Sequence, residues 1–144
     1  MKNSIWHDRF MELATLTSTW SKDPKTKVGC VIVDDQKRVL GLGYNGFPRG
    51  VDDSAERYSD KNTKLMIVKH AEENAVLNAS STEGGTAYVT LLPCCSCAGT
   101  LIQAGIKRII AKVPDDIYYI QRKEKEISLM LQMLDEAGVE FYTI

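Results

Sequence analysis

Two short stretches of the sequence carry side chains that could do chemistry. Residues 70–72 read His-Ala-Glu, and residues 93–97 read Pro-Cys-Cys-Ser-Cys. The Cys-x-x-Cys spacing lets two sulfurs bind one ion, and His70 is the obvious third ligand because the chain has only two histidines. Both stretches are predicted where the chain enters a helix, whose N-terminus favours the thiolate that a metal binds. The pattern therefore indicates a metal site formed by His70, Cys94 and Cys97.

The number of ligands points to a catalytic rather than a structural ion. Three protein ligands leave the fourth tetrahedral position to water, which is the pattern of catalytic zinc. Glu72 follows His70 by two residues in the first helical turn. Its carboxylate can reach that water without being a ligand, and can move protons between the water and a substrate. The sequence thus predicts hydrolytic zinc chemistry with Glu72 as the catalytic residue.

Two other interpretations of the cysteines stay open from the residues alone. The pair could be a redox couple, although the chain order is unlike thioredoxin, or a closed structural zinc site with Cys30, Cys95 or His7 as fourth ligand. We interpret Cys95 as a bystander because Cys94 directly follows the proline that sets the turn. Cys30 lies in an apolar run and is expected in the core. His7 is expected on the surface of a helix.

Length and charge narrow the class of protein. The 144 residues carry 18 Lys and Arg against 19 Asp and Glu, a net charge of −1, which argues against binding to nucleic acid or a membrane surface. No apolar run approaches the roughly 20 residues that cross a bilayer. Residues 1–20 have no signal-peptide pattern, so we expect a cytoplasmic protein. The length favours a single domain over residues 1–144.

The hydrophobic pattern predicts the elements that must position these side chains. We expect the order α-β-β-α-β-α-β-α-β, with right-handed crossovers and parallel pairing in the later β-α-β units, hence a mixed sheet with helices on both faces. The stretch 44–68 shows neither helical nor strand periodicity, and long irregular segments are usually functional. The expected helices cover 6–20, with Ser4 as a possible cap, then 69–79, 98–104 and 117–137. The expected strands cover 28–34, 38–43, 86–91, 106–113 and 139–144.

Several further motifs carry a resemblance to a known family. His-x-Glu with Pro-Cys-x-x-Cys is the signature of zinc-dependent nucleotide and nucleobase deaminases. The chain resembles deoxycytidylate (dCMP) deaminases in the order and spacing of these motifs over nearly its whole length. The additional matching stretches are 21–24 (Ser-Lys-Asp-Pro), 28–33, 43–50 (Gly-Tyr-Asn-Gly-Phe-Pro-Arg-Gly), 70–75 and 103–106.

The resemblance implies a fold and a reaction. The fold would be the three-layer α/β/α cytidine-deaminase-like fold with a five-stranded mixed sheet. The reaction would be hydrolytic deamination of dCMP to dUMP and ammonia, which supplies dUMP for thymidylate synthesis. His70, Cys94 and Cys97 would bind one zinc ion, and Glu72 would be the proton shuttle. Residues 45–69 contain no Cys or His, so a second zinc has no ligands there.

The same resemblance implies residues that contact the substrate. Each of them also has a purely structural interpretation. Asn45 would contact the sugar, or would only tolerate a left-handed turn. Asn74 would bond near the nucleotide, or would tie its helix to a loop. Donors for the 5′-phosphate are expected among basic and hydroxyl side chains in loops, of which each one alone is more often solvated. These candidates are Ser21, Lys22 and Arg49, with Lys25 and Arg57.

The resemblance also suggests regulation and assembly. Gly43, Tyr44 and Gly46 resemble the glycine-rich loop of members controlled by dCTP and dTTP, with Mg²⁺ accompanying the triphosphate. A homo-oligomer, with a hexamer favoured, is expected. Alternative substrates are tRNA adenosine, CMP or 5-substituted dCMP, and a non-catalytic structural zinc module is the alternative from another class.

Overall fold

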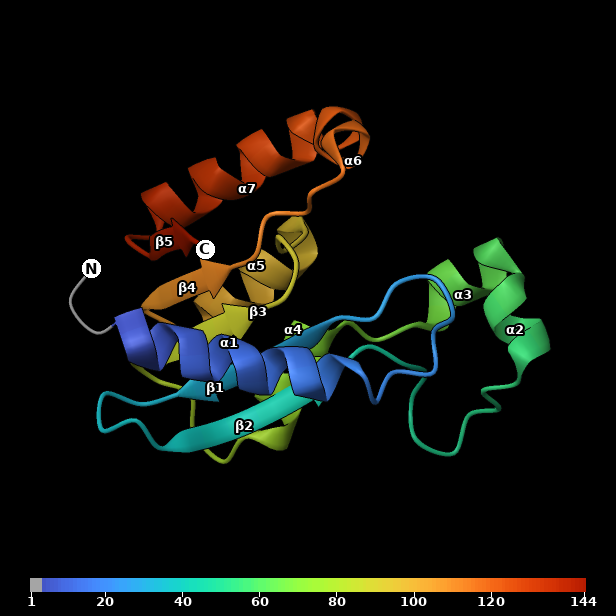
Figure 1. Cartoon of the computed structure of the whole chain (residues 1–144), viewed down its shortest axis with the longest axis horizontal. Coiled ribbons are helices and arrows are strands. Elements are labelled where there is room, and N and C mark those ends of the chain that lie inside the picture. The colour runs from blue at the N-terminus through green and yellow to red at the C-terminus, as the bar shows by residue number, and fades with distance from the viewer. Residues whose placement is uncertain (1–3) are drawn as a thin grey trace.

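A five-stranded sheet runs through the computed structural model, which describes residues 4–144 (Figure 1). The order across the sheet is β2-β1-β3-β4-β5. Strand β1 is antiparallel to β2 and β3, whereas β3, β4 and β5 are mutually parallel. The expected mixed sheet is confirmed. The strands are β1 (Gly29–Val33), β2 (Val39–Tyr44), β3 (Thr86–Val89), β4 (Arg108–Ala111) and β5 (Glu140–Thr143).

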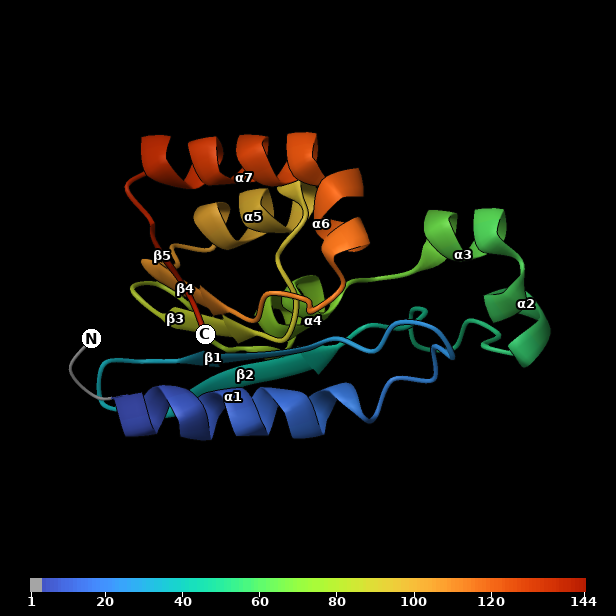
Figure 2. The same cartoon turned by 45° about the horizontal axis from the view of Figure 1, so that its top comes forward.

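Helices cover both faces of this sheet. Figure 2 shows α1 on one face and α4, α5 and α7 on the other, which confirms the three-layer α/β/α fold. No helix among residues 4–144 is long and apolar enough to span a membrane. The helices are α1 (Ser4–Ser18), α2 (Ala55–Ser59), α3 (Lys61–Ile67), α4 (Ala71–Asn78), α5 (Cys95–Gln103), α6 (Ile117–Arg122) and α7 (Glu124–Glu136).

Strand β1 explains why its sequence is apolar without alternation. All five of its residues are buried, because helices cover both of its faces. Val31 and Val33 pack in the core beneath α1, whereas Cys30 and Ile32 pack in the larger core beneath α4 and α5. The expectation that Cys30 is a core residue is confirmed.

The expectation of irregular structure over 44–68 is wrong in part. The segment contains α2 and α3, two short helices that project beyond the end of the sheet (Figures 1 and 2). Each begins at a side-chain cap, since Ser54 accepts the N–H of Arg57 and Asp60 accepts the N–H of Thr63. Helices of one or two turns are too short to produce a visible hydrophobic period.

Two other helix boundaries differ from the expectation. The predicted helix over 117–137 is divided at Lys123, whose φ of −101° and ψ of 8° separate α6 from α7. Helix α5 begins at Cys95 rather than at residue 98, because Cys94 caps it by accepting the N–H of Cys97. Two of the three clustered cysteines are therefore helical.

The prediction that His7 is a surface residue is wrong. It is 7% exposed, and its Nδ1 lies 2.8 Å from the hydroxyl of Tyr88 on β3. A buried tyrosine hydroxyl needs a hydrogen-bonding partner. His7 supplies it because it lies on the face of α1 that packs against the sheet. Burial lowers the pKa of His7. This contact attaches α1 to the middle of the sheet.

Gly43 lets α4 approach β2 closely. A Cβ atom at this position would clash with the backbone nitrogen of Ala75 and would lie 2.6 Å from the carbonyl oxygen of Ala71, both in or beside the first turns of α4. Backbone atoms of a packed helix cannot move aside as a flexible side chain can. Gly43 therefore fixes the distance between α4 and the sheet.

We expect Gly43→Ala to destabilise the fold by about 1–3 kcal/mol, the cost of overpacking a dense core. The control is Gly99→Ala in α5, where the added Cβ would meet only Met133 Cε at 3.9 Å. That substitution should leave stability unchanged or raise it by about 0.5–1 kcal/mol. Urea unfolding measures both, and equal midpoints for the two variants would contradict the packing argument.

Candidate metal centre and active site

The N-termini of α4 and α5 bring the two chemical stretches together. His70 is the N-cap of α4, and its N–H donates to Glu73 Oε1 at 3.0 Å. Cys94 is the N-cap of α5, where its sulfur accepts the N–H of Cys97 at 3.4 Å. Each cap residue is extended, so its side chain leaves the helix axis and turns toward the other helix start.

The three predicted ligands meet at one point. His70 Nδ1 lies 3.2 Å from Cys97 Sγ and 3.6 Å from Cys94 Sγ, and the three ligand atoms all lie within 4.8 Å of one another. Bonds of 2.0–2.3 Å to one tetrahedral ion place its ligand atoms about 3.5 Å apart, so the donor set fits zinc. No other group of three metal-binding side chains meets in the part of the chain that the structure describes.

The other cysteine and histidine candidates face elsewhere. Cys95 Sγ lies 3.5 Å from the carbonyl oxygen of Glu126 in α7, and His7 is bonded to Tyr88. Cys30 is enclosed in the core. None of them joins the group of three ligands, so the geometry leaves the fourth position open.

The electrostatics of this group favour a bound cation. Hydrogen bonding from the Cys97 thiol, helped by His70 and a backbone N–H, lowers the pKa of Cys94 to about 4. The same contact with Cys94 raises the pKa of Cys97, and Cys94 also raises the pKa of His70. Glu72 is 5% exposed, and burial raises its pKa to about 7. Cys94 therefore offers a thiolate to a cation, close to the Glu72 carboxyl group, whose pKa is near neutral.

Asn45 and Ser21 lie in two loops that are bonded to each other. Asn45 Oδ1 accepts the N–H of Val28 at 2.8 Å, and its Nδ2 donates to the carbonyl oxygen of Thr26 at 2.8 Å. Ser21 Oγ donates to the carbonyl oxygen of Asn45, also at 2.8 Å. Asn45 therefore connects the 21–28 loop to the end of β2.

A backbone bridge then joins the end of β2 to the metal group. The N–H of Gly46 donates to the carbonyl oxygen of Lys69 at 3.0 Å, and the N–H of Lys69 donates back at 2.8 Å. Because Lys69 directly precedes His70, this bridge places Asn45 beside the first metal ligand.

A surface groove gathers another set of the candidates. Asn74 Nδ2 donates to the carbonyl oxygen of Tyr44 at 2.8 Å, and Arg49 donates to Asn78 Oδ1 at 3.3 Å. Asn74 and Arg49, considered for substrate, thus lie with Tyr44 and Gly46, considered for effectors. The groove has a volume of about 440 Å³ and is lined by Tyr44, Gly46, Phe47, Pro48, Arg49, Lys69, Asn74, Leu77 and Asn78.

The remaining candidates do not line this groove. Lys22 is exposed and pairs with Asp53 at 2.7 Å. Arg57 donates to the carbonyl oxygen of Asp52. Gly43 lies beneath α4. Among the phosphate candidates from the 21–28 loop, only Ser21 is buried next to Asn45.

Some residues near the centre were missed by sequence reasoning. A small cavity of about 40 Å³ beside Cys94 is lined in part by Tyr119 and Lys123, which a single long helix over 117–137 would have placed differently. Asp23 and Lys64 form an ion pair, and Asp23 accepts the N–H of Thr26, to whose carbonyl oxygen Asn45 donates. The run Ser-x-Asp-Pro was a signal for Asp23, whereas nothing in the sequence singled out Lys64.

An α/β/α fold whose helix starts present His, Cys and Cys to one ion, with a buried Glu two residues after the His, defines the class of zinc-binding deaminases. Residues 4–113 match the family described as the cytidine and deoxycytidylate deaminase zinc-binding region. The chain therefore belongs to the cytidine and deoxycytidylate deaminases, and its cofactor is Zn²⁺.

Individual relatives agree with this family over most of their length. The chain is 40% identical to human deoxycytidylate deaminase, with 94% of this chain and 78% of that protein covered. It is 39% identical to an uncharacterized deaminase of Aliivibrio fischeri, covering 95% and 92%. The dCMP deaminase of cyanophage S-TIM5 in complex with dCMP and dUMP superposes with a TM-score of 0.79 at 27% identity, covering 100% and 99%.

The ligand geometry predicts the zinc content of three alanine variants. Cys94→Ala and Cys97→Ala should each reduce bound zinc from about one ion per chain to near zero, because a two-ligand site binds weakly. Cys95→Ala is the matched control and should keep its zinc. Elemental analysis of the purified proteins measures the ratio. Loss of zinc from Cys95→Ala with retention in Cys94→Ala would show that the ligands are assigned wrongly.

Proposed function

We propose that this chain catalyses the hydrolytic deamination of dCMP to dUMP and ammonia, and so supplies dUMP for thymidylate synthesis. The observation that carries the proposal is the meeting of His70, Cys94 and Cys97 beside buried Glu72, in a chain 40% identical to human deoxycytidylate deaminase. Likeness to the cyanophage enzyme bound to dCMP and dUMP supports the choice of nucleotide. In this proposal residues 1–144 form one domain that acts in the cytoplasm. The four cysteines are free, as is usual in that reducing compartment.

In the proposed mechanism, His70, Cys94 and Cys97 hold the zinc ion. When bound, zinc lowers the pKa of a water toward about 7 and so supplies the nucleophile at C4 of the ring. Glu72 would accept one proton of the attacking water and deliver it to N3 as the oxygen adds to C4. It would then carry the remaining proton of the added hydroxyl to the amino group, so that the C4–N bond breaks, ammonia leaves, and a C4 carbonyl remains. A carboxyl group whose pKa burial raises to about 7 can act as base and then as acid near neutral pH.

The proposed nucleotide contacts begin with Asn45, which would contact the sugar. Its amide still has one N–H and one lone pair beyond the bonds to Thr26 and Val28. Ser21 lies beside it, and Lys22 and Arg49 remain proposed phosphate donors, together with Asn74 near the nucleotide. Lys22 would have to leave its exposed pair with Asp53, which costs little because surface ion pairs are weak.

An ammonia-release assay against dCMP, CMP, 5-methyl-dCMP, deoxycytidine and a tRNA anticodon stem tests the substrate. We expect the highest kcat/KM with dCMP. Glu72→Gln should lower kcat by about 10²–10⁴-fold with zinc content retained, because the proton relay is lost while the ligands remain. Fastest release from another substrate would overturn the choice of dCMP, and full activity of Glu72→Gln would overturn the role of Glu72. If the zinc-loaded wild type releases ammonia from none of these substrates, a non-catalytic zinc module is favoured.

We further propose that the groove between β2 and α4 binds a nucleoside triphosphate with Mg²⁺, with dCTP as activator and dTTP as inhibitor, in a homo-oligomer that is most simply a hexamer. Tyr44 and Gly46 line the groove, and Lys69 supplies positive charge for phosphates. Gly43 contributes through the close packing of α4 on β2. Leu77, which is 73% exposed in the groove, would be covered by a neighbouring subunit.

Rate curves against dCMP test this regulation. With Mg²⁺, dCTP should lower the dCMP concentration that gives half-maximal rate and dTTP should raise it, while omission of Mg²⁺ weakens both effects. Light scattering on the same samples gives the subunit number. Hyperbolic curves that neither triphosphate moves would exclude effector binding in the groove, and a monomer would exclude the assembly.

A further inference from the structure

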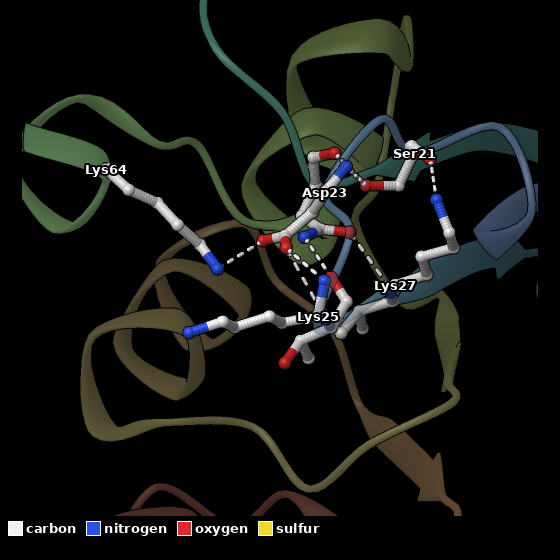
Figure 3. Close-up of polar contacts among 8 residues, drawn as sticks. Ser21, Asp23, Lys25, Lys27 and Lys64 are labelled. Carbon is white, nitrogen blue, oxygen red and sulfur yellow. Dashed lines mark hydrogen bonds and ion pairs between the residues drawn. The ribbon is translucent and has the colours of Figure 1, made fainter. Parts of the chain in front are cut away.

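The irregular 21–28 loop contains a buried carboxylate that the proposed mechanism does not use. The side chain of Asp23 is 1% exposed, and Lys64 Nζ lies 2.6 Å from its Oδ2. Lys64 belongs to α3, in the segment that projects beyond the sheet, and only 16% of its side chain is exposed. Figure 3 shows Lys64 reaching Asp23 from a separate part of the chain. The ion pair therefore attaches α3 to the loop.

Asp23 also organises the loop itself. Its Oδ1 accepts the N–H groups of Lys25 at 2.9 Å and Thr26 at 3.2 Å. The N–H of Asp23 donates to Ser21 Oγ at 3.3 Å, and Lys27 Nζ donates to the carbonyl oxygen of Ser21 (Figure 3). With Lys64 on one carboxylate oxygen and two backbone groups on the other, the loop has a defined shape without regular secondary structure.

The contacts of Asp23 keep its carboxylate ionised. Burial raises the pKa of Asp23, but the hydrogen bonds from Lys64, Lys25 and Thr26 outweigh burial, so the pKa lies below its usual value. A buried charge that loses its partner is strongly unfavourable. The loop therefore depends on Lys64 remaining in place.

The same loop holds the side chain of Asn45. Asn45 Nδ2 donates to the carbonyl oxygen of Thr26, the residue whose N–H Asp23 accepts. Ser21, which accepts the N–H of Asp23, donates to the carbonyl oxygen of Asn45. A continuous set of hydrogen bonds thus runs from Lys64 through Asp23 to both the side chain and the backbone of Asn45.

We propose that Lys64 is a positioning residue for substrate binding: its ion pair with Asp23 fixes the 21–28 loop and thereby the orientation of the Asn45 amide beside the metal group. This inference rests on the proposed function, in which Asn45 contacts the sugar. Lys64 itself touches no reacting atom. It makes the α3 segment part of the substrate site, although α3 contributes no side chain to the metal centre.

The test compares Lys64→Met, Lys64→Arg and the double variant Asp23→Asn/Lys64→Met. The double variant removes both charges and leaves an oxygen acceptor for Lys25 and Thr26, so it folds even where an unpaired Asp23 would not. Lys61→Met, an exposed lysine on the same helix, is the matched control. The measurements are kcat and KM for dCMP, zinc content, and amide hydrogen exchange over 21–28.

We expect Lys64→Met and the double variant to raise KM roughly tenfold, the loss of one well-placed hydrogen bond to substrate. Their kcat values should stay within about twofold and their zinc content unchanged, because the metal group and Glu72 are untouched. Amide exchange at Lys25 and Thr26 should accelerate. Lys64→Arg should restore most of the KM, and Lys61→Met should behave as the wild type.

Two results would overturn the inference. An unchanged KM in the double variant would show that Lys64 contributes stability alone, in which case only the amount of active enzyme, and so the apparent kcat, would fall. If amide exchange over 21–28 is unchanged in both Lys64→Met and the double variant, the ion pair does not order the loop. If the wild type fails to deaminate dCMP, the proposed function fails, and the exchange measurement still decides whether Lys64 orders the loop.

Discussion

The approach of two helix N-termini is the constraint on which the rest of the structure depends. His70 and Cys94 are cap residues, and the 3.2 and 3.6 Å contacts between the imidazole and the two sulfurs exist only because α4 and α5 begin side by side on one face of the sheet. Gly43 allows α4 to lie close to β2. Burial of Glu72 follows from the same packing, because α4 presses its first turn against the core. Metal binding and proton transfer thus both depend on how α4 and α5 pack against the sheet and against each other.

The half of the site that faces the nucleotide is built differently. It consists of irregular segments held by hydrogen bonds between side chains and backbone. Asn45 and Ser21 each bond to the main chain of the other's segment, and Asp23 bonds to the main chain of its own loop. Such bonds hold a loop in one shape when each buried polar group has a partner. Among residues 5–144, every buried side-chain nitrogen and oxygen has one. The helix starts hold the metal ligands and Glu72, and the hydrogen-bonded loops form the surface that faces the substrate.

The metal group and the sheet were predictable from the sequence, because each is a pattern of a few positions: a ligand spacing, an apolar run, a proline before a cap. Three features were not. The buried His7 is explained only by Tyr88, which is 81 positions away. The helices α2 and α3 are too short to show a period, and they are specified by caps at Ser54 and Asp60. The hydrogen bond from Asn74 to Tyr44 depends on which side of α4 faces β2. For His7 and Asn74 the deciding contact is long-range, and a single sequence contains no record of it. For α2 and α3 the caps are local, but one or two turns are too short to show a hydrophobic period.

The spacing of the metal ligands also bears on how the chain folds. His70 and Cys97 are 27 positions apart, whereas α1 makes its contact with β3 across 81 positions. Closing a short loop costs less conformational entropy than closing a long one, and local contacts form faster. The unit from α4 through β3 to α5 can therefore assemble before α1 docks, although α1 is made first. Zinc that binds this unit would stabilise it as a nucleus, so metal supply would act on the yield of folded protein as well as on its activity.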